Sequence, residues 1–225
     1  MKKIFIMTLA CVMLLSTQAL AFSFEQISPE ELFSPEVIQQ EDISDWAKKE
    51  IALSWQAGLI TEHTCTYMTK DMTRFQFAEL IVNLAEKVTQ KEMAPADANT
   101  FTDCSDPVIL KAYAAGIVSG VGNSRFDPNA NTNREQIASM IARAIDYITQ
   151  ETGINVAPAA AQIDAFSDKD QVSSWAVDGV GRLAANNIMS GTSATTLSPQ
   201  NSCTAEQGIL FCYRVYDQFQ TMSGK

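Results

Sequence analysis

The chain has a single histidine, few basic side chains and no long apolar segment after its first residues. A nucleophilic site built on an imidazole would depend on His63 alone. Lys and Arg number 16 against 26 Asp and Glu, a net charge of −10, and such a surface repels nucleic acid and anionic lipid. Nucleotide-binding and serine-hydrolase motifs are also missing from the sequence. We therefore expect neither an enzyme nor a nucleic-acid-binding protein, and no cofactor.

The first residues have the pattern of an export signal. Two lysines precede an apolar run over residues 4–15 and a small-x-small site that ends at Ala21. The run is too short to cross a bilayer of about 30 Å, so we predict a signal peptide over residues 1–21. Cys11 would suit a lipoprotein, but it lies inside the apolar run. We expect a secreted chain without a membrane span and with a net charge of about −12 after the two lysines are removed.

Four cysteines remain beyond the predicted signal peptide: Cys65, Cys104, Cys203 and Cys212. Export permits disulfides, and four cysteines allow three complete pairings that the sequence does not separate. Cys203 and Cys212 lie about 13 Å apart along one predicted helix, too far for a bridge. Cys212 falls on the apolar face of that helix, so we expect a buried free thiol there.

The same order of residue types returns three times along the chain. A helix-opening motif stands at three places: Thr73-Arg74, Asn133-Arg134 and Thr204-Ala205. A turn residue precedes these motifs by 15, 17 and 17 residues: Gly58, Gly116 and Asn187. Trp46 and Trp175 each lie 12 residues before the turn residue of their copy. Several independent spacings agree, so we predict three repeats, over residues 42–90, 101–150 and 164–220, after an acidic segment over residues 22–41.

Each copy predicts a short helix, a turn, a loop and a longer helix. Thr73, Asn133 and Thr204 are suited to cap the long helices. A glutamine three residues later completes a capping-box pattern in each copy: Gln76, Gln136 and Gln207. Apolar residues then recur at helical spacing and are expected to be buried: Phe77, Leu80, Ile81, Leu84, Ile137, Met140, Ile141, Ile145, Ile209, Cys212, Val215 and Phe219. One helical hairpin cannot cover its own apolar face, so we expect an all-α protein in which the three units pack on one another.

The second copy resembles a known repeat family. The stretch "FTD…AYAAGIVSGVGNSRFDPNANTNREQIASMIARAI" is similar to the S-layer homology (SLH) repeat, and the other two copies match it more weakly. The resemblance implies three repeats in a pseudo-threefold bundle, with the long helices central and grooves between neighbouring units. It also implies non-covalent binding to a glycan of the bacterial cell wall, commonly a pyruvylated secondary polymer attached to peptidoglycan. The alternative is a structural or protein–protein interaction module at the cell surface that does not bind glycan.

Candidate ligand contacts follow from the repeat pattern. An arginine at a helix start, beside exposed backbone N–H groups, suits a carboxylate such as a pyruvyl ketal. The tryptophans offer flat faces to sugar rings or, alternatively, anchor the core, and the arginines could instead form structural salt bridges. Glycines near the motif would let a ligand approach the backbone. The candidates are Arg74, Arg134, Thr73, Trp46, Trp175, Gly120 and Gly191.

Departures from the pattern limit these expectations. Ala205 replaces the arginine in the third copy, so we expect at most one or two competent grooves. Asp103 and Asp168 are expected to bond the local backbone of a turn. The stretch from Asp127 resembles a calcium loop but lacks its glycine and its final glutamate, and His63 has no second pair of zinc ligands beside it. We expect no metal site.

Overall fold

The computed structural model describes residues 42–65 and 67–224. The predicted signal peptide and the acidic segment over residues 22–41 lie outside the described residues. Every regular element within the described ranges is helical, which confirms the all-α prediction: α2 (Lys48–Gln56), α3 (Arg74–Thr89), α4 (Pro107–Ala114), α5 (Arg134–Thr152), the 3₁₀ turn η2 (Lys169–Gln171), α6 (Val177–Ala185) and α7 (Ala205–Ser223). None of these helices has the length and apolarity needed to cross a bilayer.

The long helices α3 and α5 begin at the predicted capping boxes. Thr73 Oγ1 accepts the N–H of Gln76 at 3.2 Å, and Gln76 Oε1 accepts the N–H of Thr73 at 2.9 Å. Asn133 and Gln136 make the same reciprocal pair before α5. Each box satisfies two backbone donors that a helix start would otherwise leave unpaired.

The start of α7 differs from the other two. Thr204 Oγ1 accepts the N–H of Gln207 at 3.4 Å, as predicted. The side chain of Gln207 does not complete a box, because its Oε1 accepts a hydrogen bond from Arg134 at 3.2 Å instead. The third predicted capping box is therefore wrong, and the glutamine holds an arginine of another repeat.

The apolar positions predicted for the three long helices are all buried. They are Phe77, Leu80, Ile81, Leu84, Ile137, Met140, Ile141, Ile145, Ile209, Cys212, Val215 and Phe219. The three helices contact one another pairwise, so these side chains form one shared core. Burying a large apolar side chain contributes about 1.5–3 kcal/mol, so this core is the main source of stability.

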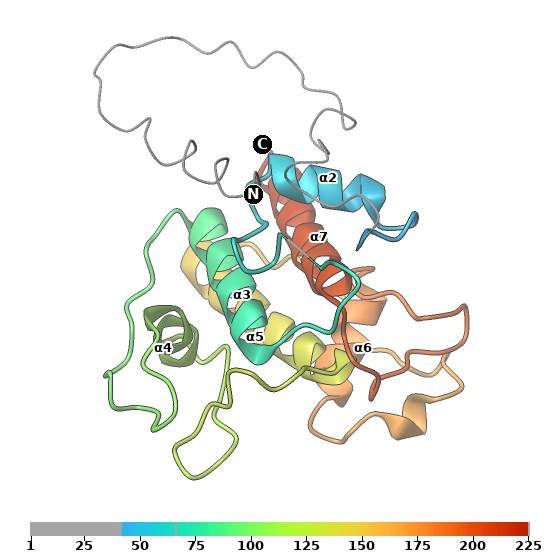
Figure 1. Cartoon of the computed structure of the whole chain (residues 1–225). Coiled ribbons are helices and arrows are strands. Elements are labelled where there is room, and N and C mark those ends of the chain that lie inside the picture. The colour runs from blue at the N-terminus through green and yellow to red at the C-terminus, as the bar shows by residue number, and fades with distance from the viewer. Residues whose placement is uncertain (1–41, 66, 225) are drawn as a thin grey trace, which may run out of the picture.

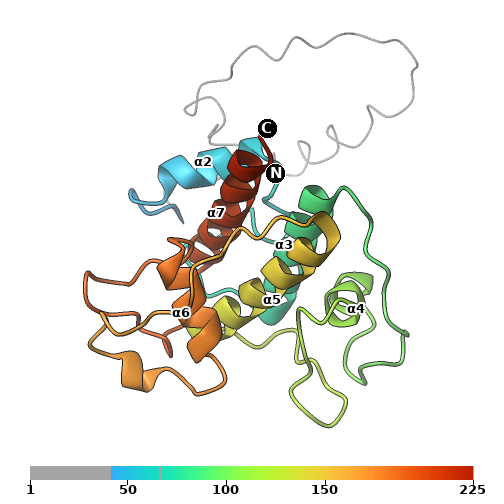
Figure 2. The same cartoon turned by 180° about the vertical axis from the view of Figure 1, so that it is seen from behind.

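The short helices lie outside the three long ones (Figure 1). Helix α4 packs on α3, α6 packs on α5, and α2 packs on α7. Figure 2 shows α6 beside α5 from behind. Within the described chain, no short helix contacts the long helix of its own repeat. The predicted helical hairpin is therefore wrong: the loop of 15–17 residues before each long helix carries the chain to the next face of the bundle. The contact of α2 with α7 closes the ring of repeats.

Three backbone hydrogen bonds mark the pseudo-threefold axis. Met72 N–H donates to Cys203 O at 2.8 Å, Cys203 N–H to Thr132 O at 2.9 Å, and Thr132 N–H to Met72 O at 2.9 Å. Each of these residues lies two positions before the first residue of a long helix. The closed cycle fixes the three helix starts relative to one another, as the predicted pseudo-threefold bundle requires.

The four cysteines of the described chain carry free thiols. Cys65 and Cys104 are partly buried, whereas Cys203 and Cys212 are buried. Burial raises the pKa of Cys203 to about 12 and raises the pKa of Cys212 further, so both stay protonated at neutral pH. Cys212 thus lies in the core, where its spacing predicted a free thiol.

Candidate functional site

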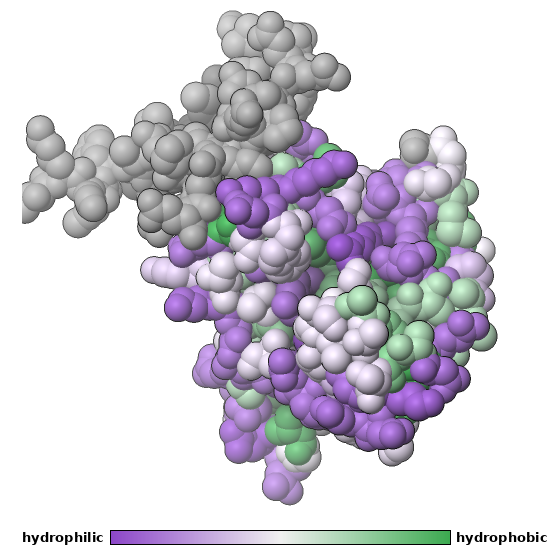
Figure 3. All heavy atoms as spheres, turned by 90° about the vertical axis from the view of Figure 1, so that its right-hand side faces the viewer, coloured by the Kyte–Doolittle hydropathy of each residue, from purple (hydrophilic) through white to green (hydrophobic). Residues whose placement is uncertain are grey.

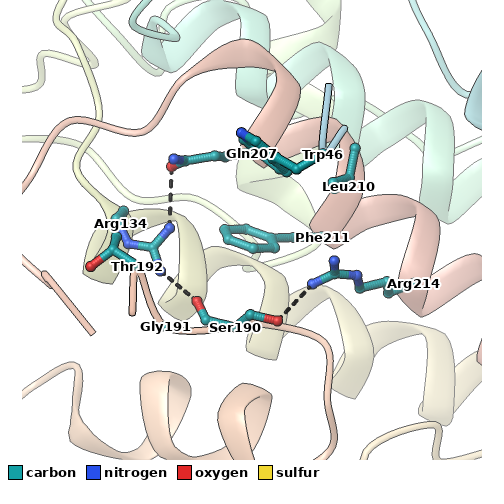
Figure 4. Close-up of a pocket in the computed structure, with 9 residues that line it drawn as sticks. All are labelled: Trp46, Arg134, Ser190, Gly191, Thr192, Gln207, Leu210, Phe211 and Arg214. Atoms are coloured by element: carbon teal, nitrogen blue, oxygen red, sulfur yellow. Dashed lines mark hydrogen bonds between the residues drawn. The ribbon is translucent and has the colours of Figure 1, made fainter. Parts of the chain in front are cut away.

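Two grooves bring together six of the seven candidate residues. Groove A has a volume of about 500 Å³ and is lined by Trp46, Arg134, Ser190, Gly191, Thr192, Gln207, Leu210, Phe211 and Arg214 (Figure 4). Groove B has a volume of about 250 Å³ and is lined by Arg74, Ser119, Gly120, Val121, Gln136, Met140, Arg143 and Trp175. Thr73 lines neither groove. Each groove therefore holds one predicted arginine, one predicted tryptophan and one predicted glycine, each from a different repeat.

Arg134 is held firmly at the back of groove A. Its Nε donates to Leu197 O at 2.9 Å, one terminal nitrogen donates to Ser190 O at 2.7 Å, and the other donates to Gln207 at 3.2 Å. The guanidinium also lies 5.6 Å from the ring centre of Phe211. Only 2% of Arg134 is exposed. The arginine joins the second repeat to the third and leaves few donors for a ligand.

Arg74 is held more loosely in groove B. Its Nε donates to Phe126 O at 2.8 Å and one terminal nitrogen donates to Ser119 O at 2.9 Å. The guanidinium stacks on the Phe126 ring, 4.4 Å from its centre. Burial lowers the pKa of Arg74 and also that of Arg134, yet arginine stays charged at neutral pH. Neither arginine forms an ion pair with a carboxylate of the described residues.

The backbone amides at the helix starts are not exposed. Arg74 N–H donates to Ala130 O and Phe75 N–H donates to Pro128 O, both at 2.9 Å. The first two amides of α5 and α7 are bonded in the same way: Arg134 to Asn201, Glu135 to Pro199, Ala205 to Lys70 and Glu206 to Met68. The third amide is bonded to the capping side chain. The expectation of free amides beside the arginines is wrong, because the next loop supplies carbonyls to them.

Both groove tryptophans are exposed and not part of the core. Trp46 is 58% exposed and Trp175 is 55% exposed. The interpretation of these residues as core anchors is therefore wrong. In the view of Figure 3, hydrophilic residues predominate and apolar residues are exposed in small separate areas. An exposed indole beside a guanidinium offers the flat apolar face that a sugar ring can stack on.

Two buried glutamates position the tryptophans. Glu206 accepts hydrogen bonds from the N–H and hydroxyl of Ser44, at 3.0 and 2.8 Å, two residues before Trp46. Glu135 accepts the same pair from Ser173, at 2.9 and 2.7 Å, two residues before Trp175. Sequence reasoning missed both glutamates. Their signal was a glutamate at the second helical position, present in the second and third copies but replaced by Phe75 in the first.

The groove glycines have a packing role. A Cβ at Gly191 would lie 2.4 Å from Thr196 O and 2.5 Å from Ser193 O, and a Cβ at Gly120 would lie 2.7 Å from Arg125 O. These separations are too short for any side chain. Glycine is therefore required at both positions by the tight loop that forms the groove wall.

Asp103 and Asp168 form hydrogen bonds to the loops that form the groove walls. Asp103 accepts the N–H groups of Phe126 and Asp127, each at 2.9 Å, and these bonds keep its pKa below the ordinary value. Asp168 accepts the N–H groups of Leu197 and Ser198, at 2.8 and 2.7 Å. The expected bonding to backbone is present, but the partners are 23 to 30 residues along the chain and not in the local turn.

Each groove contains a second arginine that sequence reasoning missed. Arg214 lines groove A and Arg143 lines groove B. Both donate to the carbonyl of the residue after the turn position, Ile188 at 3.2 Å and Ile117 at 2.9 Å. Both also lie nine positions after the first residue of a long helix. That shared spacing was the available signal, with Asn83 at the same place in the first repeat.

The third interface, where α7 meets α3, has different chemistry. Ala205 stands where the other grooves have Arg74 and Arg134. On α3, Glu79 accepts a hydrogen bond from His63 Nδ1 at 2.9 Å, and this bond raises the pKa of His63. The other oxygen of Glu79 is buried and has no hydrogen-bond partner among the described residues. This interface carries an acid where the other two carry guanidinium groups.

Comparison with known proteins assigns two of the three predicted repeats to a family. The family model "S-layer homology domain" matches residues 97–138 and 165–207, which include the starts of α5 and α7. Within the described part of the chain, no group of three or more His, Cys, Asp or Glu side chains could hold a metal ion.

Relatives include an endoglucanase of Bacillus sp. (strain KSM-635), 28% identical over 73% of this chain and 17% of its own length. An exoglucanase XynX of Acetivibrio thermocellus is 26% identical over 79% of this chain and 16% of its own. An S-layer protein of Bacillus thuringiensis subsp. finitimus is 26% identical over 69% of this chain and 18% of its own. The chain therefore matches less than a fifth of each of these relatives. These matches identify S-layer homology domains in this chain, over residues 97–138 and 165–207.

Proposed function

We propose that this protein attaches without a covalent bond to the bacterial cell wall by binding an acidic glycan through grooves A and B. The ligand class is a pyruvylated secondary polymer linked to peptidoglycan. In this proposal the protein is secreted and acts at the cell surface by binding and not by catalysis.

The observation that carries the proposal is the composition of the two grooves. Each unites an exposed tryptophan, an arginine without a carboxylate partner in the described chain and a glycine loop. A sugar ring of an acidic glycan can stack on the indole of either groove, and a guanidinium with free donors can form charge-assisted hydrogen bonds to a carboxylate of that glycan. In a protein with a net charge of −10, such local cationic pockets are needed to hold an acidic ligand.

The names of the relatives agree with this role. They include surface-layer proteins and polysaccharide-degrading enzymes, which share with this chain only a small part of their length. A module that surface-layer proteins and enzymes have in common is more consistent with attachment than with a catalytic activity.

The test is sedimentation of the purified mature protein with cell-wall sacculi. We expect wild-type protein to pellet and the double variant Arg74→Ala, Arg134→Ala to remain in the supernatant. Lys91→Ala with Lys169→Ala removes the same charge from two exposed lysines outside the grooves, and should pellet like wild type. A folded arginine variant that pellets as well as wild type would refute the grooves as the binding site.

Two treatments of the sacculi separate the ligand classes. Mild acid hydrolyses pyruvyl ketals, so acid-treated sacculi should lose binding. Protease treatment removes wall proteins and should leave binding unchanged. Loss of binding after protease alone would instead support a protein partner.

A further inference from the structure

A carboxylate outside the lining of groove A neutralises one of the two arginines of that groove. Glu50, on α2, accepts hydrogen bonds from Arg214 Nε and from a terminal nitrogen, each at 2.8 Å. Both side chains are mostly buried, with 22% of Arg214 and 26% of Glu50 exposed. A bidentate pair of this kind is among the stronger ionic contacts in proteins. Arg134 is then the one arginine of groove A whose charge no carboxylate balances, and three of its nitrogens already donate to the protein.

Groove B also has two arginines, Arg74 and Arg143, but within the described chain no carboxylate forms an ion pair with either of them. Arg143 donates to Ile117 O at 2.9 Å and, within residues 42–65 and 67–224, forms no ion pair. Burial is the main cause that lowers the pKa of Arg74, Asp127 opposes it, and the charge of Arg143 lowers the pKa of Arg74 further. Two like charges in one groove repel each other until an anion enters between them.

The packing of α6 explains why groove B lacks the balancing acid. Glu50 lies four residues after Trp46, and the residue four after Trp175 is Gly179. A Cβ at Gly179 would lie 2.9 Å from the Cα of Ser139 on α5. The two helices are too close for any side chain there, so no glutamate could reach Arg143 from that position.

We propose that Glu50 determines the ligand of each groove: groove B takes the carboxylate-bearing sugar of the wall glycan, and groove A takes an uncharged sugar of the same polymer. This assignment rests on the proposed function. Groove A suits a neutral ring because it is the larger, because Phe211 lies between its two arginines (Figure 4), and because Trp46 adds a second aromatic face. The side chains of Gln207 and Thr192 line it and can bond sugar hydroxyls.

The three tryptophans allow ligand binding to be monitored separately at each groove. Trp46 reports on groove A, Trp175 on groove B, and Trp55, packed against the core, serves as an internal reference. The probe is a methyl hexoside that carries a pyruvyl ketal, compared with the methyl ester of the same compound, which lacks the charge. Indole N–H signals in ¹H–¹⁵N spectra, assigned with single Trp→Phe variants, are followed during titration.

The expected result is a difference between grooves. The Trp175 signal should shift at about tenfold lower concentration of the acid than of the ester, because two guanidinium groups without ion-pair partners attract the carboxylate. The concentrations of acid and of ester at which the Trp46 signal shifts should lie within about twofold of each other, since Glu50 cancels the charge of Arg214. Equal discrimination by both tryptophans would overturn the assignment. If neither tryptophan responds to either compound, the proposed function fails as well.

Two variants test the cause. Glu50→Gln should give groove A an acid preference of several-fold, because it frees the charge of Arg214. Asp170→Asn makes the same change in net charge at an exposed site outside both grooves and should have no effect. Arg143→Gln should remove most of the acid preference at Trp175. An unchanged Trp46 response in Glu50→Gln would refute the role of Glu50.

Discussion

Grooves A and B have the same backbone frame but hold their arginines differently. Arg134 is 2% exposed and bonded through three nitrogens, whereas Arg74 is partly exposed and bonded through two. The difference arises because Gln207 is not used in a capping box and reaches Arg134, while its equivalent Gln136 caps α5. The arginine of the same helix-opening motif therefore has a mainly structural role in groove A, as Arg134, and is more accessible to a ligand in groove B, as Arg74.

The third interface extends the comparison. It has Ala205 in place of the arginine and Phe75 in place of the glutamate that holds a tryptophan loop. Glu79 and His63 form a hydrogen-bonded pair on α3 instead. Loss of the guanidinium leaves an interface with acidic character, so we expect it to take no part in binding an acidic glycan.

The largest expected effect is a difference in stability between variants of Arg134 and of Arg74. Arg134→Ala leaves the buried carbonyls of Ser190 and Leu197 without donors, and we expect it to lower the free energy of unfolding by about 3 kcal/mol. Arg74→Ala should cost about 1 kcal/mol, because water can reach the groups that it exposes. Urea denaturation measures both. Equal losses would mean that the grooves do not differ in the way their contacts indicate.

A smaller effect is expected at the glutamates. Glu206→Gln and Glu135→Gln each remove a charged acceptor from a serine, at a cost of about 1 kcal/mol. Each should also increase the mobility of one tryptophan, Trp46 and Trp175 respectively. Fluorescence anisotropy of variants that retain a single groove tryptophan checks this. Increased mobility of both tryptophans in either variant would contradict a separate clamp for each groove.

The smallest effect concerns the third interface. The bond to Glu79 raises the pKa of His63 above its ordinary 6.5, so its stabilising contribution is complete below pH 6.5 and is lost as the pH rises through the higher folded-state value. The contribution is small because half of the imidazole is exposed to water. Thermal midpoints measured on both sides of that pKa should show the loss, and His63→Gln should remove it. An unchanged pH profile in His63→Gln would exclude the pair as its source.

Much of the helical architecture could be predicted from the sequence. The starts of all three long helices, their buried faces and the turn residues Gly58, Gly116 and Asn187 follow from local patterns, and all three turn residues have positive φ. The charge balance of the grooves could not be predicted in this way. Glu50 and Arg214 are 164 residues apart, so no local pattern links them.

The sequence by itself determined which residues form helices, which faces are apolar and where the arginines and tryptophans recur, because capping and helical periodicity act over a few residues. Only the tertiary structure decided which repeats supply each groove. Each short helix crosses to the long helix of another repeat, and the loops bring carbonyls to amides that would otherwise be free. These outcomes depend on packing between distant segments, in which a single glycine or glutamate changes the charge that a ligand meets.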